Sequence, residues 1–293
     1  MTSRVTEFAS RKDERMLNLE NQTAKANLFR DLHRGPGTLL LPNAWDVASA
    51  RILEEAGVAA IATTSAGIAF ALGYPDGQKI SRKEMLAMVT RIAAKIRIPV
   101  TADVEAGYGD RPEDAALTAR AVIEAGAVGL NLEDSTDNPQ HSLIDLSLQL
   151  EKIVATRETA RAMGVPLVLN ARTDVYLLEV GDPETRFDQT LKRLTAFRDA
   201  GADCLFAPGL RDVDLISQLV RELQYPLNIL AGPGSPSIPE LQKLGVARVS
   251  LGSSPMRATL GLIRRIAEEL QTTGTYHAME GAPSHAAVNK LLN

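Results

Sequence analysis

Two acidic residues, Asp103 and Glu105, stand one residue apart where an apolar segment of the chain ends. The segment that leads to them, residues 98–103, is rich in β-branched residues and predicts a buried strand. A Gly-Tyr-Gly loop follows at residues 107–109, and glycines let a ligand approach the backbone closely. Such a pair of carboxylates is able to hold a divalent cation that prefers oxygen ligands. The alternative is a polar turn whose acids face water, and this stretch alone does not decide between the two.

Apolar runs and helical patterns alternate through most of the chain. Strands that are buried on both faces form continuous apolar runs, and strands that alternate with helices form parallel sheets. Eight such units in about 230 residues favour a closed (β/α)8, or TIM, barrel over an open doubly wound α/β sheet. The expected strands lie at residues 39–43, 58–63, 98–103, 127–132, 165–171, 202–206, 226–230 and 246–251.

The repeat divides the chain into three parts. Residues 1–35 are polar and charged, and we interpret them as an N-terminal extension with a helix near residues 21–32. Residues 36–270 form the expected barrel, without an internal domain boundary, and residues 271–293 form a C-terminal tail.

Composition excludes several classes of function. A formal net charge of −4 provides no basic field, so we expect neither a nucleic acid nor a membrane as partner. Neither a leader segment nor a long apolar run is evident, which predicts a cytoplasmic protein. The single cysteine, Cys204, lies in an expected strand, where it acts as a small buried apolar residue rather than a nucleophile.

Polar residues follow most of the expected strands. In a (β/α)8 barrel the carboxyl ends of the strands carry the chemistry. Acids from neighbouring strands, such as Asp103 and Glu133, repel one another there unless a cation neutralises them. Oxygen ligands without a nearby Cys or His favour Mg²⁺ or Mn²⁺ over zinc. The other polar residues expected at this mouth are Asn43, Trp45, Thr63, Thr64, Ser65, Glu105, Asp134, Asn170, Arg172, Asp174, Asn228 and Ser250.

Six short motifs at these strand ends together resemble the isocitrate lyase/phosphoenolpyruvate mutase superfamily. The resemblance extends from about Leu39 to Leu270. The motifs are Pro42-Asn43-Ala44-Trp45-Asp46, Thr64-Ser65-Ala66-Gly67, Gly73-Tyr74-Pro75-Asp76, Asp103-Val104-Glu105-Ala106-Gly107-Tyr108-Gly109, Leu132-Glu133-Asp134 and Asn170-Ala171-Arg172-Thr173-Asp174.

The resemblance implies a Mg²⁺-dependent site, with Mn²⁺ as a substitute, for 2-oxo acids and their enolates. By the family pattern Asp103 binds the metal directly, and water molecules link the ion to Glu105, Glu133 and Asp76. The resemblance also implies a homo-oligomer, a dimer or a tetramer, whose last helix is exchanged between subunits.

The same resemblance assigns the substrate contacts. The backbone amides of Ser65, Ala66 and Gly67 take the substrate carboxylate. Trp45 and Arg172 border the oxygen that becomes the enolate, and Asn228 lines the far side of the site. With Glu133, Trp45 and Arg172 form the catalytic set that the resemblance implies.

Four departures from the superfamily pattern narrow the chemistry. Isocitrate and methylisocitrate lyases carry a Lys-Lys-x-Cys-Gly-His loop after the fourth strand, whereas residues 133–141 contain no cysteine. Residues 133–145 also lack the lysine of the phosphoenolpyruvate mutase loop. Glu105 takes the place of an aspartate, and residues 206–209 lack the glutamate of members that cleave tricarboxylates.

We therefore expect a Mg²⁺-dependent carbon–carbon lyase that cleaves or decarboxylates a small 2-oxo or 2-hydroxy di- or tricarboxylic acid through an enolate. One alternative is phosphorus–carbon chemistry of the phosphoenolpyruvate mutase or phosphonopyruvate hydrolase type. Another is a barrel that binds a 2-oxo acid without turning it over. A phosphosugar barrel is the last, with Gly232–Ser235 as its phosphate loop, although Pro233 removes one of the amides needed.

Overall fold

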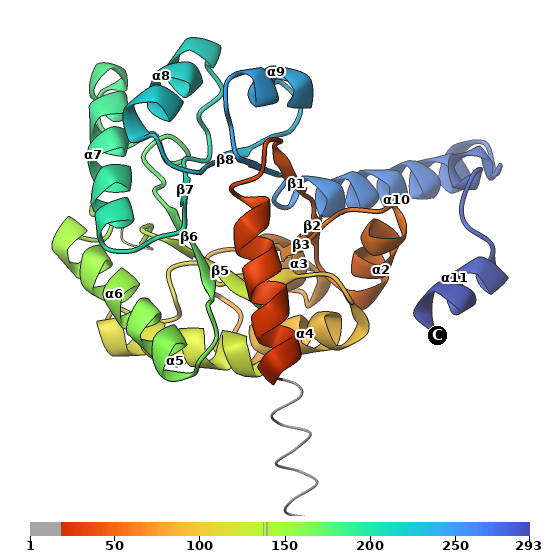
Figure 1. Cartoon of the computed structure of the whole chain (residues 1–293). Helices are drawn as coiled ribbons and strands as arrows, with labels where there is room; N and C mark the ends of the chain where they lie inside the picture. The colour runs from red at the N-terminus through yellow and green to blue at the C-terminus, as the bar shows by residue number, and fades with distance from the viewer. Residues whose placement is uncertain (1–18, 137, 139) are drawn as a thin grey trace, which may run out of the picture.

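A ring of parallel strands surrounded by helices forms the centre of the computed structural model, which describes residues 19–136, 138 and 140–293 (Figure 1). Most of the strands are short, and each pairs in parallel with its neighbours around the ring. The strands are β1 (Leu39–Leu41), β2 (Asn43–Ala44), β3 (Ile61–Thr63), β4 (Val100–Asp103), β5 (Gly129–Glu133), β6 (Val168–Arg172), β7 (Cys204–Phe206), β8 (Leu227–Leu230) and β9 (Arg248–Ser250).

Pro42 joins β1 to β2 and explains how the ring closes. β1 pairs with β9 and β2 pairs with β3, so the two short strands act as one strand that Pro42 interrupts. Asn43 braces this seam, because its Nδ2 donates to the Thr63 carbonyl at 2.8 Å while its Oδ1 accepts from the backbone of Leu251 and Gly252. The nine strands therefore occupy eight positions, which confirms the predicted (β/α)8 barrel.

The helices follow the strands in the predicted alternation, with one addition. A short additional helix, α3, follows β3 directly, because Thr64 caps its first turn by accepting a hydrogen bond from the Gly67 amide. The helices are α2 (Val47–Glu55), α3 (Ser65–Ala71), α4 (Arg82–Lys95), α5 (Pro112–Glu124), α6 (Leu146–Ala162), α7 (Arg186–Asp199), α8 (Val213–Leu223), α9 (Ile238–Lys243), α10 (Ser254–Thr272) and α11 (His285–Leu292), with 3₁₀ turns η1 (Pro183–Thr185) and η2 (His277–Met279).

A helix over residues 19–32 precedes the first strand and covers the end of the barrel opposite the mouth (Figure 1). Ala26 and Phe29 are fully buried in the main core cluster. Gln22 donates from Nε2 to the Ile123 and Ala127 carbonyls, at 2.8 and 2.9 Å. Because these contacts join it to the start of the strands, the helix seals the bottom of the barrel.

His33 follows this helix and is buried with its Nδ1 2.7 Å from the Phe29 carbonyl oxygen. Burial, and next the charge of Arg248, lower the pKa of His33 to about 3. The unfolded chain binds a proton there below about pH 6.5, whereas the folded chain does not, so stability is complete above that pH and is lost as the pH falls.

We expect His33→Gln to remove this pH dependence. The unfolding free energy of the wild type should fall by about 1–2 kcal/mol between pH 7.5 and pH 5 through this group. Urea titrations of both proteins at the two pH values measure the difference. Equal losses in wild type and His33→Gln would contradict the assignment.

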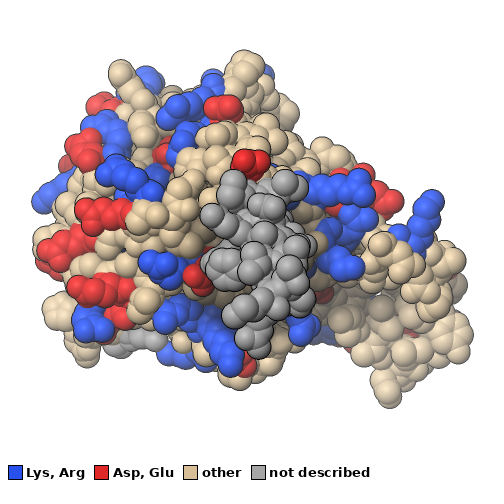
Figure 2. Space-filling model, turned by 60° about the horizontal axis from the view of Figure 1, so that its bottom comes forward, with Lys and Arg blue, Asp and Glu red and all other residues tan. Residues whose placement is uncertain are grey.

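Side chains of both charges are intermixed on the face shown in Figure 2. None of the helices in the described parts of the chain combines the length and apolar character needed to cross a bilayer. At the C-terminal end, α10 projects from the barrel and α11 lies back toward α2, where the Arg51 side chain donates to the Leu291 carbonyl (Figure 1).

Candidate active site

A cavity of about 300 Å³ opens at the carboxyl ends of the strands. Five of the residues that were assigned to the metal or the substrate contribute to its wall. These are Ser65, Ala66, Asp76, Asp103 and Arg172. The cavity also reaches residues that lie deeper in the barrel, among them Thr101, Asn131 and Arg248.

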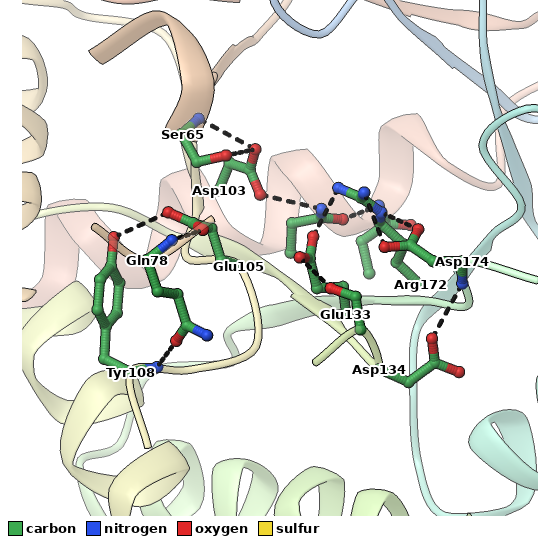
Figure 3. Close-up of polar contacts among 12 residues, drawn as sticks. Ser65, Gln78, Asp103, Glu105, Tyr108, Glu133, Asp134, Arg172 and Asp174 are labelled. Atoms are coloured by element: carbon green, nitrogen blue, oxygen red, sulfur yellow. Dashed lines mark hydrogen bonds and ion pairs between the residues drawn. The ribbon is translucent and has the colours of Figure 1, made fainter. Parts of the chain in front are cut away.

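Asp103 ends β4 and carries the best-defined carboxylate of the cavity (Figure 3). Its Oδ2 accepts hydrogen bonds from the Ser65 amide at 3.1 Å and from the Ser65 hydroxyl at 2.8 Å. Its Oδ1 accepts from Asn131 Nδ2 at 3.1 Å. Donors from α3 and β5 thus fix both oxygens and aim the carboxylate into the mouth.

Glu105 lies on the loop after Asp103 in a left-handed backbone conformation, with φ of 51°. Its Oε2 accepts from the Gln78 amide, and its Oε1 accepts from the Tyr108 hydroxyl at 3.4 Å (Figure 3). Gln78 and Tyr108 also have positive φ, and the Tyr108 amide donates to Gln78 Oε1 at 2.7 Å. Left-handed conformations at residues other than glycine are uncommon and cluster at functional sites.

Negative charge accumulates around Glu105. Burial, and then the charges of Asp103 and Asp76, raise the pKa of Glu105 to about 7. Burial and the charge of Asp103 likewise raise the pKa of Asp76. These three acids are therefore close enough to repel one another, as the sequence predicts for carboxylates that share a cation.

Lys152, on α6, holds the loop that carries Glu105. Its side chain is fully buried, and its Nζ donates to the Ala106 carbonyl at 2.6 Å and to the Gly109 carbonyl at 3.0 Å. This role was not predictable from the sequence, because a lysine on a helix is usually exposed and the buried face of α6 is largely polar. Lys152 therefore helps to fix the position of Glu105 without contacting it.

We expect Lys152→Met to weaken metal binding rather than to abolish it. The two carbonyls lose their donor, which should lower the unfolding free energy by about 1–3 kcal/mol. As the loop loosens, the Mg²⁺ concentration for half-maximal thermal stabilisation should rise about 10-fold, by analogy with residues that orient metal ligands. Lys192→Met, at an exposed position on α7, is the control. Unchanged Mg²⁺ dependence in Lys152→Met would refute the positioning role.

Arg172 ends β6 and lies between two carboxylates (Figure 3). Its Nη1 is 2.6 Å from Glu133 Oε2, and its Nε and Nη2 form a two-point contact with Asp174 at 2.6 and 2.9 Å. Burial alone would lower the pKa of Arg172, but the charges of Asp174 and then Glu133 raise it above its usual range. Burial raises the pKa of Glu133, and Arg172 opposes that shift.

Asp134 follows Glu133 but points away from the cavity. It is fully buried, forms an ion pair with Arg193 of α7 at 2.6 Å, and accepts from the Asp174 amide at 2.9 Å (Figure 3). We expected Asp134 at the mouth, and the structure instead places it beneath the Arg172 network. Its carboxylate holds the backbone of Asp174, and Asp174 in turn orients Arg172.

Trp45 and Gly67 pack against each other beside the mouth. A Cβ at Gly67 would lie 2.5 Å from Thr64 Cγ2 and 3.1 Å from Trp45 Cβ, so only glycine fits there. Trp45 also packs against the apolar cluster that contains Ile68. Neither residue belongs to the cavity wall described above, and both support the first turn of α3, where Ser65 and Ala66 do line the cavity.

The remaining predicted residue, Asn228, lies below the mouth. Its side chain is fully buried in β8 and donates from Nδ2 to Ser250 Oγ at 3.1 Å. Ser250 lines the cavity, so Asn228 supports the wall from behind. Asn131 was missed, although it interrupts an otherwise apolar run, and a polar residue between buried ones on a central strand was the available signal.

The donor set fits Mg²⁺ better than a metal that is held by protein ligands alone. Within the described residues, no group of three or more His, Cys, Asp or Glu side chains is arranged to bind a metal. Mg²⁺ usually keeps several waters and takes one or two carboxylates. One well-fixed carboxylate, Asp103, whose charge acts on the neighbouring acids Asp76 and Glu105, matches that preference.

The barrel is similar to that of 2,3-dimethylmalate lyase, a member of the phosphoenolpyruvate mutase/isocitrate lyase superfamily, and this chain is a member of the same superfamily. The family model described as phosphoenolpyruvate phosphomutase matches residues 29–271, so the chain belongs to that family.

Three relatives illustrate the range of the similarity. A protein of Burkholderia cenocepacia J2315, provisionally assigned as a lyase/mutase, is 41% identical with a TM-score of 0.87, over 92% of this chain and 96% of that one. An uncharacterized protein of Mycobacterium tuberculosis (strain CDC 1551 / Oshkosh) is 38% identical over 232 residues, 79% of this chain and 84% of the relative. Oxaloacetate acetylhydrolase in complex with its product oxalate is 26% identical with a TM-score of 0.80, over 92% and 93%.

Proposed function

We propose that the protein is a Mg²⁺-dependent carbon–carbon lyase that forms an enolate from a small 2-oxo or 2-hydroxy di- or tricarboxylic acid. The observation that carries this proposal is the carboxylate of Asp103, which donors from two elements, α3 and β5, aim into a cavity that Arg172 also lines. Superfamily members bind Mg²⁺ and small carboxylic acids, which supports the choice of metal and substrate class.

In this proposal Asp103 holds the metal directly, and Glu105, Glu133 and Asp76 hold it through water. Mg²⁺, for which Mn²⁺ can substitute, would supply positive charge beside the substrate's keto oxygen and stabilise an enolate there. The acids whose charges repel one another around Glu105 support this arrangement, because a cation removes that repulsion.

The first turn of α3 takes the substrate carboxylate in this scheme. The first amides of a helix have no partner within the helix. The Ser65 amide donates to Asp103 and the Gly67 amide donates to Thr64, so the Ala66 amide is the one in this turn best placed to serve a ligand. Ala66 lines the cavity, which supports its assignment.

Arg172 flanks the developing negative charge, and Trp45 stands behind it beside the mouth, where it supports the first turn of α3. Two carboxylates fix the guanidinium of Arg172, so it need not reorganise when charge develops on the substrate, and preorganised charge is what lowers barriers of this kind. Asn228 supports the opposite wall through Ser250.

The proton that the enolate takes up would come from water rather than from a thiol. Cys204, the single cysteine of the chain, lies in β7, and burial raises its pKa to about 11. Decarboxylation of an oxo-dicarboxylate releases CO2 and takes one proton from water, and hydrolytic cleavage takes both the proton and the hydroxyl of a water molecule. These reactions therefore fit the site better than cleavage of isocitrate.

A pyruvate-release assay with oxaloacetate, with and without Mg²⁺, tests the proposal. Metal-dependent release above the background that free Mg²⁺ gives would support it. Oxalate and acetate as products would indicate hydrolytic cleavage. Inorganic phosphate released from phosphonopyruvate, with no turnover of any oxo-dicarboxylate, would overturn it in favour of phosphorus–carbon chemistry. Tight, Mg²⁺-dependent binding of oxo acids without any turnover would indicate a binding protein instead.

We further propose that the protein forms a homo-oligomer in which subunits exchange α10. Leu260, Ile263 and Leu270 lie on one face of this projecting helix and are exposed, which leaves an apolar stripe for contact with another subunit. Ile263→Asp should shift the mass measured by light scattering from a dimer or tetramer to the monomer. Arg264→Asp, on the neighbouring exposed position, is the control. A monomeric wild type would contradict this proposal.

A further inference from the structure

A buried guanidinium forms the floor of the cavity. Arg248 is the first residue of β9, at the end of the barrel opposite the mouth, and it is only 2% exposed. It nevertheless lines the same cavity as Asp103. Its guanidinium lies near enough to the buried thiol of Cys204, in β7, for the two groups to affect each other's pKa.

The charge of Arg248 has no close counter-charge. Among the described residues, no carboxylate lies within ion-pair distance of it, and the nearest polar contact is His33 Nε2 at 3.5 Å from Nη1. His33 stays neutral when buried, so it adds no negative charge. Burying an isolated charge is costly, and proteins usually pair such a charge or bind an ion against it.

Two polar atoms that face this region are also without partners. Arg248 Nε and Thr101 Oγ1 are buried and form no hydrogen bond with any described residue. Thr101 lines the cavity two residues before Asp103 on β4, on the same face of the strand. A Cβ at Gly129 would lie 2.8 Å from Thr101 Oγ1, so the hydroxyl points into the interior of the barrel.

We propose that Arg248 and Thr101 form an anion subsite at the bottom of the cavity, which takes a carboxylate of the substrate remote from the 2-oxo group. Arg248 Nε and the Thr101 hydroxyl donate to this carboxylate. The inference rests on the proposed function, because a metal at Asp103 would hold the 2-oxo acid end of the same molecule. The substrate is then a 2-oxo dicarboxylate rather than a monocarboxylate.

Binding of two ligands that share the 2-oxo acid group tests the subsite. Pyruvate carries that group alone, and 2-oxoglutarate adds a remote carboxylate. With Mg²⁺ present, calorimetry on the wild type should give a Kd for 2-oxoglutarate at least about 10-fold below that for pyruvate, as a desolvated charge-assisted contact predicts. Arg248→Met should abolish this preference and leave pyruvate binding unchanged. Arg248→Lys should retain part of it, and Thr101→Val should reduce it.

The thermal stability of Arg248→Met distinguishes a ligand-binding role of Arg248 from a structural one. If Arg248 serves a ligand, Arg248→Met removes an uncompensated buried charge, and the ligand-free Tm should stay level or rise by about 2 °C. A lower Tm in Arg248→Met together with an unchanged preference for 2-oxoglutarate would overturn the subsite. Arg257 lies at the rim of the cavity. If Arg257→Met loses the preference for 2-oxoglutarate while Arg248→Met keeps it, the subsite is also overturned.

Failure of the subsite and failure of the proposed function give different results. If the subsite is wrong but the function is right, Arg248→Met and wild type release pyruvate from oxaloacetate with the same KM. If the function is wrong, the wild type shows no Mg²⁺-dependent release. A wild type that binds pyruvate and 2-oxoglutarate equally well would overturn the subsite directly.

Discussion

Asp103→Asn is expected to remove Mg²⁺-dependent turnover almost completely. The asparagine side chain keeps the shape of the carboxylate but loses its charge, and its amide group meets the donors of Ser65 and Asn131. We expect kcat/KM to fall by at least about 10³-fold, the size of the loss when a main electrostatic contact to the transition state is removed. The thermal stabilisation that Mg²⁺ gives the wild type should disappear as well.

Two measurements make this expectation specific. Asp199→Asn, an exposed acid at the end of α7, changes the net charge equally and should leave turnover and the response to Mg²⁺ unaltered. Asp103→Asn should lose no more than about 1–3 kcal/mol of unfolding free energy, the cost of its mismatched hydrogen bonds. A variant that folds, binds Mg²⁺ as the wild type does and retains turnover would show that Asp103 is not the metal ligand.

Replacement of Arg172 is expected to have the largest effect on stability. Arg172→Met leaves Glu133 and Asp174 without their cation, and breaking a buried pair costs about 3–5 kcal/mol. Arg172→Lys keeps the charge but cannot reproduce the two-point contact with Asp174 while it also reaches Glu133. We expect both variants to lose at least about 10²-fold in kcat/KM, as for a removed donor to a developing negative charge.

A double-mutant cycle separates the two roles of Arg172. If Glu133 and Arg172 interact as the 2.6 Å contact indicates, Glu133→Gln in the Arg172→Met background should recover part of the lost stability. It should recover no turnover, because the cation beside the enolate is still missing. Additive losses of unfolding free energy would contradict the ion pair, and recovered turnover would contradict the role assigned to Arg172.

The barrel itself was predictable because the apolar runs and the helix patterns of the sequence both indicate it. Apolar runs such as residues 202–206 and helix patterns such as residues 112–125 repeat eight times, and buried parallel strands need such runs. The N-terminal helix was also visible as a local pattern. That Ala26 and Phe29 enter the core at the bottom of the barrel was not, because two apolar residues in a polar segment do not reveal what they pack against.

The candidate site likewise has a part that the sequence predicts and a part that it does not. Sequence order places Asp103, Glu105 and Arg172 at strand ends, since the connectivity of a (β/α)8 barrel brings those ends to one face. It does not show which way each side chain turns. Asp134 follows Glu133 directly, yet it pairs with Arg193 below the cavity, because successive side chains of a strand point to opposite sides.

The sequence by itself thus determined the architecture, the superfamily and the acids at the mouth, all of which depend on local pattern and on strand order. Tertiary structure alone decided what surrounds them. Lys152 and Arg248 are cations that sequence statistics place in solvent, and both are buried, one against loop carbonyls and one beneath the cavity. The physical reason is that the burial of a charge depends on partners distant in the chain, which only the folded barrel brings together.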